Sequence, residues 1–344
     1  MIQALTLISQ TMRESEWSTR LLLNGPIVAL GTVADVVDET SGSRSCSIEI
    51  EDLKASCKWR VSGERADMSM AVESVSLGGA PNATTAQMHR LVPHGASQEY
   101  VNLAAKVERM EYLSAERMGP RDVYDLVDEY NRGTVGARGE FAAGTLYAYR
   151  DLDVVPIPMS PQPDALKLLN QVRGWLAHLF PGSDLQMQKV PYSAHVTLGF
   201  RTSISQDFYM PQNVGFGLTQ VFPILVAALA AAQGGIVAIE NPEVHLHPAG
   251  QAEIARFLAA VAASGRQVIV ESHSDHVLSG IRRAVKDGLL PKTSVAIHFF
   301  RPRSDEGAQI ISPQVDQNGD LDTWPEGFFD QFDKDASYFA GWSD

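Results

Sequence analysis

The stretch that decides the fold is residues 234–248, which read GGIVAIENPEVHLHP. Its apolar run, 236–239, ends abruptly in Glu240, and this pattern predicts a buried central strand with a carboxylate at its C-terminal end. Pro242 and Pro248 then prevent the segment from continuing as one regular element. In open α/β sheets, ligands bind just beyond the carboxyl ends of such strands. One acid after one strand is also typical of a chain leaving the core through a polar turn, so neighbouring segments must decide between the two interpretations.

Helix and strand patterns alternate around this stretch. The predicted order is helix 218–233, strand 236–239, helix 251–263, strand 267–271, helix 275–287 and strand 294–299. An alternation of this kind implies a parallel sheet with right-handed crossover connections.

Three segments, taken together, resemble the ABC-type ATPases. IVAIENPEVHLHP (236–248) resembles the Walker B and D-loop segment of the SMC-like and RecF-like branch of the AAA-family ATPases. NVGFGLTQVFPIL (213–225) resembles the signature motif, and VIVESHSD (268–275) resembles the strand and switch histidine that follow Walker B. The resemblance covers roughly 199–300 and implies an α/β fold of the P-loop NTPase, ABC-ATPase type. That fold has a mostly parallel sheet flanked by helices, an antiparallel β-subdomain and a helical arm.

The resemblance also implies a domain organisation. We expect an ATPase domain at 1–300 and a small C-terminal domain at 301–344, where DLDTWPEGFFDQFD resembles a domain of unknown function often attached to these ATPases. The ATPase domain divides into an antiparallel β part (about 21–77), a helical arm (about 100–194) and a lobe with the signature, Walker B and switch motifs (about 195–300). Two-residue alternation of apolar side chains over 45–77 independently predicts antiparallel strands.

A phosphate-binding P-loop is not found in the sequence. The loop needs the pattern G-x-x-x-x-G-K-[ST], and none of the lysines directly follows a glycine. Residues 1–12 have apolar positions at helical spacing. In the resembled family, a very similar helix directly follows the P-loop. We therefore expect that the first strand and the P-loop precede the point where this chain begins.

The resemblance implies a role for four polar residues. Glu240 stands where the family has an acid that orders the Mg²⁺ shell, and His273 is the switch histidine that contacts the γ-phosphate of ATP. Asn241 stands where the family has a glutamate that polarises the attacking water. An amide takes up no proton near neutral pH, but it positions water as a hydrogen-bond acceptor. Glu243 is the nearby carboxylate that would substitute as the base.

The signature segment is expected to bind ATP held by a partner subunit. Its residues are Gly215, Phe216, Gly217, Leu218 and Thr219. The glycines keep the backbone open and bring the N-terminus of the next helix toward phosphate, and Thr219 supplies a hydroxyl near the position where the family has serine. ATP and Mg²⁺ are the implied cofactors. The implied partner is a second copy of the chain, paired through the signature and D-loop segments, and family analogy adds a nuclease partner or DNA.

Composition limits the class of protein. The net charge of −13 argues against a protein that coats nucleic acid unaided. Two cysteines, Cys46 and Cys57, make no disulfide framework and favour a reducing cytoplasm. The longest apolar run, 221–232, is too short to span a bilayer and contains Pro223. We expect a cytoplasmic protein without a membrane partner.

Two alternatives stay open at the level of sequence. A metal-dependent hydrolase would bind zinc or two metal ions through nitrogen and oxygen ligands. Its ligands would come from Glu243, His245, His247, His273, Asp275 and His276. A non-catalytic interaction subunit would keep an ABC-like fold, lack the P-loop, and work by dimerising or docking. Binding of an ATP analogue and metal analysis separate these alternatives from the ATPase.

Overall fold

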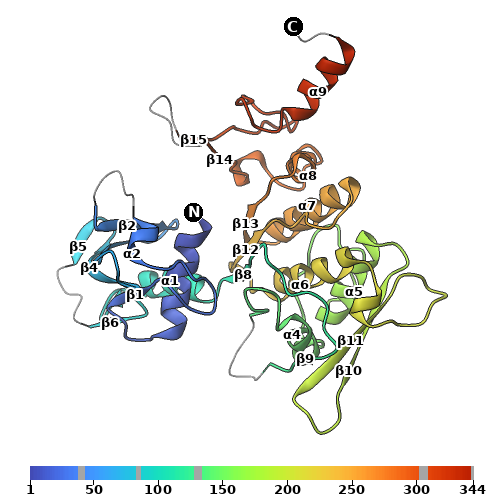
Figure 1. Cartoon of the computed structure of the whole chain (residues 1–344), viewed down its shortest axis with the longest axis horizontal. Coiled ribbons are helices and arrows are strands. Elements are labelled where there is room, and N and C mark those ends of the chain that lie inside the picture. Colours follow the sequence, from blue (N-terminus) through green and yellow to red (C-terminus); the bar gives the residue numbers. More distant parts are fainter. Residues whose placement is uncertain (38–42, 83–86, 128–133, 302–308, 342–344) are drawn as a thin grey trace.

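The computed structural model describes residues 1–37, 43–82, 87–127, 134–301 and 309–341 (Figure 1). The helices are α1 (Ile2–Glu14), α2 (Val33–Val36), α3 (Gln98–Glu108), α4 (Ala142–Tyr149), α5 (Leu168–Leu179), α6 (Phe216–Ala230), α7 (Pro248–Ala263), α8 (Asp275–Lys286) and α9 (Gln331–Ala340), with 3₁₀ turns η1 (Pro211–Asn213) and η2 (Lys292–Ser294). The strands are β1 (Arg20–Leu22), β2 (Ser45–Glu51), β3 (Ser56–Ser62), β4 (Ser69–Leu77), β5 (Ala80–Asn82), β6 (Met88–His89), β7 (Val92–Pro93), β8 (Glu111–Leu113), β9 (Tyr124–Asp125), β10 (Asp184–Lys189), β11 (His195–Arg201), β12 (Ile236–Glu240), β13 (Gln267–Glu271), β14 (Phe299–Phe300) and β15 (Ile310–Ile311).

A parallel sheet of three strands, ordered β13-β12-β8, lies at the centre of the molecule (Figure 1). The predicted strand around Ile239 is confirmed as β12, the middle strand, and the predicted strand 267–271 is confirmed as β13. The side chains of Val237, Ala238 and Ile239 are fully buried, as expected for a strand covered on both faces. In register, Glu240 lies opposite Glu271. Both strands therefore end in an acid at the same edge of the sheet.

The two faces of this sheet pack against different elements. Ala238 packs with Ile2 of α1 on one face. Val237 and Ile239 belong to the cluster that contains the buried side chains of α6 and α7 on the other face. Helix α6 is buried over most of its length, which fits a helix that is apolar all round. α4 and α5 pack against α6 on the side away from the sheet (Figure 1).

The prediction of a mostly parallel sheet is confirmed only in part. Among the described residues, parallel pairing is limited to β8-β12-β13. The other sheets are antiparallel: β1-β4-β3-β2 with β5 on β4, β10-β11-β9, β6-β7 and β14-β15. The antiparallel strands expected over 45–77 are confirmed as β2, β3 and β4. In β3, buried Cys57, Trp59 and Val61 alternate with exposed Lys58 and Arg60. Both cysteines are free.

The expected strand 294–299 is also wrong. This segment begins in η2, and the two-residue strand β14 pairs antiparallel with β15 rather than joining the parallel sheet. The reason is visible in the packing, because buried Leu290 and the partly buried Val295 contact the cluster of Ala259 and Ala284 on α7 and α8. This contact holds the chain against the helices and away from the sheet edge.

The range expected to form a helical arm is of mixed structure. A stripe of apolar residues at helical spacing predicts a helix before Pro181, and this helix is confirmed as α5, which has 12 residues. The stripe consists of Leu166, Leu169, Val172, Leu176 and Leu179. Between 100 and 194, however, α3, α4 and α5 are interleaved with β8, β9 and β10 in the described residues. The hairpin of β10 and β11 projects from the body of the molecule (Figure 1).

The C-terminal segment packs on α8. A tight turn with Gly319 at φ +78° brings Val315 opposite Leu321, as the Asn318-Gly319 pair predicts. Arg282 of α8 donates from Nε to the carbonyl of Gly319 at 2.5 Å. No described helix is both long enough and apolar enough to cross a membrane.

The contact between α7 and α8 generates a stability prediction. A Cβ added at Gly280 of α8 would lie 2.5 Å from the carbonyl oxygen of Ala252 and 2.7 Å from Cβ of Ala255. We expect Gly280→Ala to lower the free energy of unfolding by about 1–2 kcal/mol, because overpacking outweighs the helix propensity gained. Gly250→Ala in α7 is the matched control, since its Cβ would meet only Leu246 at 3.6 Å. Urea unfolding measures both variants, and equal stabilities would contradict close packing at Gly280.

Candidate functional site

Glu240 lies at the carboxyl edge of the parallel sheet, where two donors fix its carboxylate. The hydroxyl of Tyr112 donates to Oε1 at 2.9 Å, and the backbone N–H of Ala115 donates to Oε2 at 3.1 Å. Burial together with the charges of Glu240 and Glu271 raises the pKa of Tyr112, so the phenol stays protonated as a donor. The carboxylate is therefore oriented by β8 and by the loop that follows it.

Glu240 shares its face of the sheet with α1. Side chains alternate along a strand, so Glu240 points to the same face as Ala238, which packs against Ile2. The C-terminal end of α1 lies over the start of β8, because Arg13 donates to the carbonyls of Glu108 and Met110 at 2.5 and 2.6 Å. The N-terminal turn of α1 therefore lies toward the carboxyl edge of the sheet.

Asn241 has an unusual backbone and an unpaired side-chain oxygen. Its φ is +44°, in the left-handed region, and its N–H donates to the carbonyl of Glu271 at 2.8 Å. Its Oδ1 is buried and accepts no hydrogen bond from the described residues. A buried acceptor without a partner costs about 1–3 kcal/mol, and a bound water or ligand donor would satisfy it. The side chain is thus available to hold a donor at the sheet edge.

Glu243 joins the turn after β12 to the segment after β13. Its Oε2 accepts from the hydroxyl of Ser272 at 2.9 Å, and its Oε1 accepts from the backbone N–H of His273 at 3.0 Å. The His273 residue is exposed. Ser274 then caps α8 by accepting from the backbone N–H groups of His276 and Val277, as predicted for an N-cap serine.

The signature segment lies against the D-loop of the same chain. Gly217 has no room for a side chain, because a Cβ would lie 2.8 Å from the carbonyl oxygen of His245. The rings of Phe216 and His245 make an edge contact with centroids 4.8 Å apart. Gly215, the N-cap of α6, is exposed.

Leu218 and Thr219 lie on the inner side of this segment. Leu218 is 4% exposed and Thr219 is 8% exposed, and the Thr219 hydroxyl donates to the carbonyl of Phe216 at 2.8 Å. In this conformation the hydroxyl is engaged within its own helix. Gly215 and Phe216 are therefore the members of the five-residue set that are open to solvent.

Arg117 completes the site and was not assigned a role from sequence. It is 6% exposed, and its Nη1 donates to the carbonyls of Glu240 and Ser114 at 2.8 and 3.3 Å. Its Nη2 donates to the carbonyl of Asn241 at 2.5 Å. Burial lowers the pKa of Arg117 to about 10, so it stays charged near neutral pH. Two of its three acceptors are backbone carbonyls more than 120 residues away, which no local pattern reveals.

The residues proposed for a metal-dependent hydrolase are not assembled into a metal site. In the described part of the chain, no group of three or more His, Cys, Asp or Glu side chains is placed to hold a metal ion. His245 packs on Phe216, and His276 lies 3.7 Å from the carboxylate of its neighbour Asp275. This geometry does not favour the alternative of a zinc or two-metal hydrolase.

Removal of the Arg117 guanidinium tests whether it holds the sheet edge. We expect Arg117→Ala to lower the free energy of unfolding by about 2–4 kcal/mol, because carbonyls that accept from a buried cation lose their donor. Arg121→Ala is the matched control from the same loop, since Arg121 is exposed and its change should stay within about 0.5 kcal/mol. Chemical denaturation measures both, and similar small losses would show that Arg117 does not support the edge.

Comparison with known families gives two matches along the chain. Residues 160–279 match a model described as "AAA domain, putative AbiEii toxin, Type IV TA system". Residues 290–337 match a model described as "Protein of unknown function (DUF3696)", which overlaps the expected C-terminal domain. None of the curated proteins compared with the chain matches it.

Solved structures with some likeness to the chain are heads of SMC proteins. The Smc head bound to the C-terminal winged-helix domain of ScpA is 11% identical, with a TM-score of 0.44, over 80% of this chain and 76% of that one. The Smc head with an extended coiled coil from Pyrococcus furiosus is 12% identical, with a TM-score of 0.40, over 69% and 73%. The SMC head from Thermotoga maritima is 8% identical, with a TM-score of 0.32, over 76% and 72%. Similarity at this level assigns neither functional residues nor an activity to this chain. The AAA-domain match to residues 160–279 supports an ATPase of the AAA/ABC kind.

Proposed function

We propose that the carboxyl edge of the β8-β12-β13 sheet binds ATP with Mg²⁺, and that the chain works as an ABC-type, SMC/RecF-like ATPase. The observation that carries the proposal is the position of Glu240. Its carboxylate ends a buried central strand, and it lies on the face covered by α1, whose N-terminal turn lies toward the same edge. The N-terminus of a helix favours phosphate groups, because its backbone N–H groups have no partner within the helix. The AAA-domain match supports the same class.

The hydrogen bonds to the Glu240 carboxylate are compatible with a magnesium site. Each carboxylate oxygen accepts one protein hydrogen bond and keeps lone-pair capacity for a further partner. Mg²⁺ in phosphate sites is usually held by one or two carboxylates, with waters and phosphate oxygens completing the shell. When bound, the ion neutralises negative charge on the phosphates. Tyr112 and Ala115 orient the Glu240 carboxylate, and Arg117 holds the backbone on which it stands.

Asn241 is proposed to position the attacking water. Its Oδ1 is an acceptor without a described partner, and an amide holds water without taking its proton. Hydrolysis with an amide in this position is expected to be slow, since no base removes the proton in the transition state.

Glu243 and His273 are proposed to act as a pair. The carboxylate of Glu243 is engaged by Ser272 and by the His273 backbone, so in this conformation it serves to position His273. The exposed ring of His273 is then the group that would contact the γ-phosphate. Glu243 becomes a base only if these two hydrogen bonds are released.

The exposed signature residues support a proposal of dimerisation. Gly215 and Phe216 are open to solvent at the start of α6, beside the D-loop residue His245. We infer a homodimer in which these segments face the nucleotide of the other copy. A role in DNA repair or in defence against foreign DNA, with DNA or a nuclease as partner, rests on family analogy.

The affinity of this chain for ATP is a first test. Most phosphate contacts in P-loop proteins come from the loop itself, and the 344 residues contain no lysine directly after a glycine. We expect ATP to bind weakly, and titration calorimetry measures this. A micromolar dissociation constant would contradict the assignment, because it would require phosphate contacts from residues outside the proposed site.

The activity test joins a strand and a G-x-x-x-x-G-K-[ST] loop ahead of Ile2. We expect Asn241→Glu to raise steady-state phosphate release, because a positioned base typically contributes about 10²–10⁴-fold. Glu240→Gln should lower it by weakening the metal shell, and His273→Ala should lower it by removing a phosphate contact. Wild-type rates in both of these variants would place the nucleotide site elsewhere. Asn241→Glu slower than wild type would make Glu243 the first candidate base.

A second candidate function is a non-catalytic interaction subunit with an ABC-like fold. The absence of a P-loop pattern from these residues is the observation that favours it. The same experiment decides between the two, because an interaction subunit would show no nucleotide-dependent change after the loop is added.

A further inference from the structure

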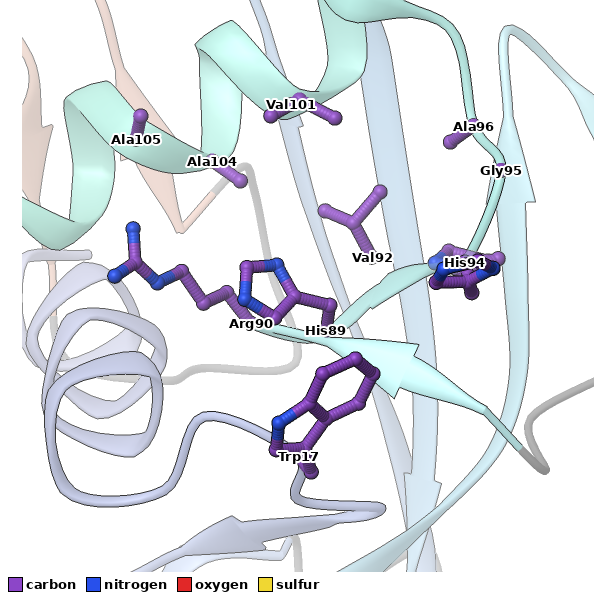
Figure 2. A pocket seen from close by; sticks show the side chains of 11 residues that line it. Trp17, His89, Arg90, Val92, His94, Gly95, Ala96, Val101, Ala104 and Ala105 are labelled. Atoms are coloured by element: carbon purple, nitrogen blue, oxygen red, sulfur yellow. The ribbon is translucent and has the colours of Figure 1, made fainter.

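A pocket lies beside α3 (Figure 2). Its volume is about 340 Å³, at the lower end of the range for small-molecule sites. The floor is apolar and includes the buried Val92 and Ala104, and the rim carries three rings from Trp17, His89 and His94 (Figure 2). The pocket therefore combines an apolar base with aromatic walls.

The aromatic walls are arranged around an exposed indole. Trp17 follows α1 and is 58% exposed, which is high for a side chain that usually buries most of its area. The ring of His89 lies 4.9 Å from the indole, and the ring of His94 lies 6.4 Å from it with the two planes 30° apart. A large exposed aromatic surface at the rim of a hollow is typical of a binding site.

The charges around the pocket are largely balanced. Arg90 donates from Nη1 to Glu108 at 2.8 Å, and the Nε2 of His89 lies 2.8 Å from a carboxylate oxygen of Glu16. The ring of His94 makes no hydrogen bond to any residue that the structure describes. The pocket therefore suits an uncharged planar group whose edge can hydrogen-bond to an imidazole.

The backbone turn that carries Arg90 is strained. Arg90 and Leu91 join β6 to β7 with φ values of +50° and +58°, and neither is a glycine. This conformation costs about 1–2 kcal/mol per residue. It is held by the N–H of Arg90, which donates to the carbonyl of Glu16 at 2.7 Å, and by the indole of Trp59, which donates to the carbonyl of Leu91 at 2.7 Å. Strain that the surroundings over-determine is concentrated at binding sites.

We propose that this pocket binds a purine nucleobase, stacked on Trp17 and hydrogen-bonded at its edge by His94. A purine is a neutral planar ring with donors and acceptors, which matches the aromatic faces and the balanced charge. An aromatic side chain of a partner protein would use the apolar floor and leave the imidazole unused. The base comes either from a free nucleotide or from an unstacked position of a single strand.

This site is distinct from the proposed phosphate site at the sheet edge and does not depend on it. Trp17 follows the C-terminal end of α1, whereas the proposed phosphate site lies at the N-terminal end. A helix of 13 residues is about 20 Å long. One nucleotide therefore does not occupy both sites.

The proposal is tested by measuring the binding of adenosine to the full chain with ligand-observed NMR. Adenosine carries no phosphate, so it reports on the base pocket alone. We expect Trp17→Ala to weaken binding about tenfold or more, because stacking on an aromatic side chain carries much of the affinity for a base. His94→Ala should also weaken it, and Trp17→Phe should restore part of it. Because Trp17 is largely exposed, its replacement should leave the fold intact, and circular dichroism checks this.

A control variant separates this pocket from other surfaces. Trp324→Ala removes another half-exposed tryptophan in the C-terminal segment and should bind adenosine like wild type. If Trp324→Ala weakened adenosine binding as much as Trp17→Ala does, the effect would not be specific to the pocket and the proposal would be overturned.

The choice of ligand identifies the source of the base. Tighter binding of adenosine monophosphate than of a short oligodeoxyadenylate supports a free nucleotide, and the reverse order supports a single strand. Ribose should not bind. The proposal is overturned if adenosine gives no saturable binding, if Trp17→Ala binds it unchanged, or if N-acetyltryptophanamide binds more tightly than adenosine. The last result would assign the pocket to a protein side chain.

Discussion

The structure depends on one constraint, the burial of β12 on both faces. With Val237, Ala238 and Ile239 fully out of water, every backbone N–H and C=O of this strand needs a partner. Parallel pairing with β8 and β13 supplies them, and it brings two segments distant in sequence to the same edge. Polar side chains are tolerated only where the strand ends. Glu240 is therefore forced to the rim of the sheet, and the candidate site forms there.

The rim is held by charged groups that act on the backbone. Arg117 binds the carbonyls at the end of β12, and Glu243 binds the hydroxyl and N–H at the end of β13. Each is a buried or partly buried charge whose hydrogen bonds are made to groups fixed by the sheet, so the two turns cannot move independently. The left-handed Asn241 lies between them, with its side-chain oxygen unpaired. The arrangement keeps the backbone of the two turns rigid and leaves Oδ1 of Asn241 available to a ligand.

The antiparallel sheet and the C-terminal segment are held by other contacts than the parallel sheet. The antiparallel sheet buries one face against α1 and α3, so α1 is shared between two cores. The same helix separates the sheet edge from the Trp17 pocket. At the other end of the chain, the C-terminal segment packs on α8 through Arg282 and the apolar contacts of Val315 and Leu321. The chain after α8 consequently follows the helices and does not extend the parallel sheet.

Sequence by itself determined the features that depend on local periodicity. The apolar run ending in Glu240, the alternation over 45–77, the stripe of α5, the cap at Ser274 and the turn at Gly319 are each set by spacing or by the conformational preference of one residue. They were predictable because the physical cause lies within a few residues. The position of Glu240 was likewise predictable, since a strand that must be buried places its terminal acid at an edge.

Only the tertiary structure decided the rest. β8 is three residues long and gains its place by pairing with β12, more than 120 residues later, and Arg117 gains its partners in the same way. The contact of Gly217 with the His245 carbonyl and the unpaired oxygen of Asn241 depend on how separate segments meet. The apolar pattern that predicts a strand at 294–299 is the instructive error, because Val295 of this segment packs with Leu290 against α7 and α8 instead of joining the sheet. Local sequence specifies that a side chain must be buried, and the packing of distant elements decides what buries it.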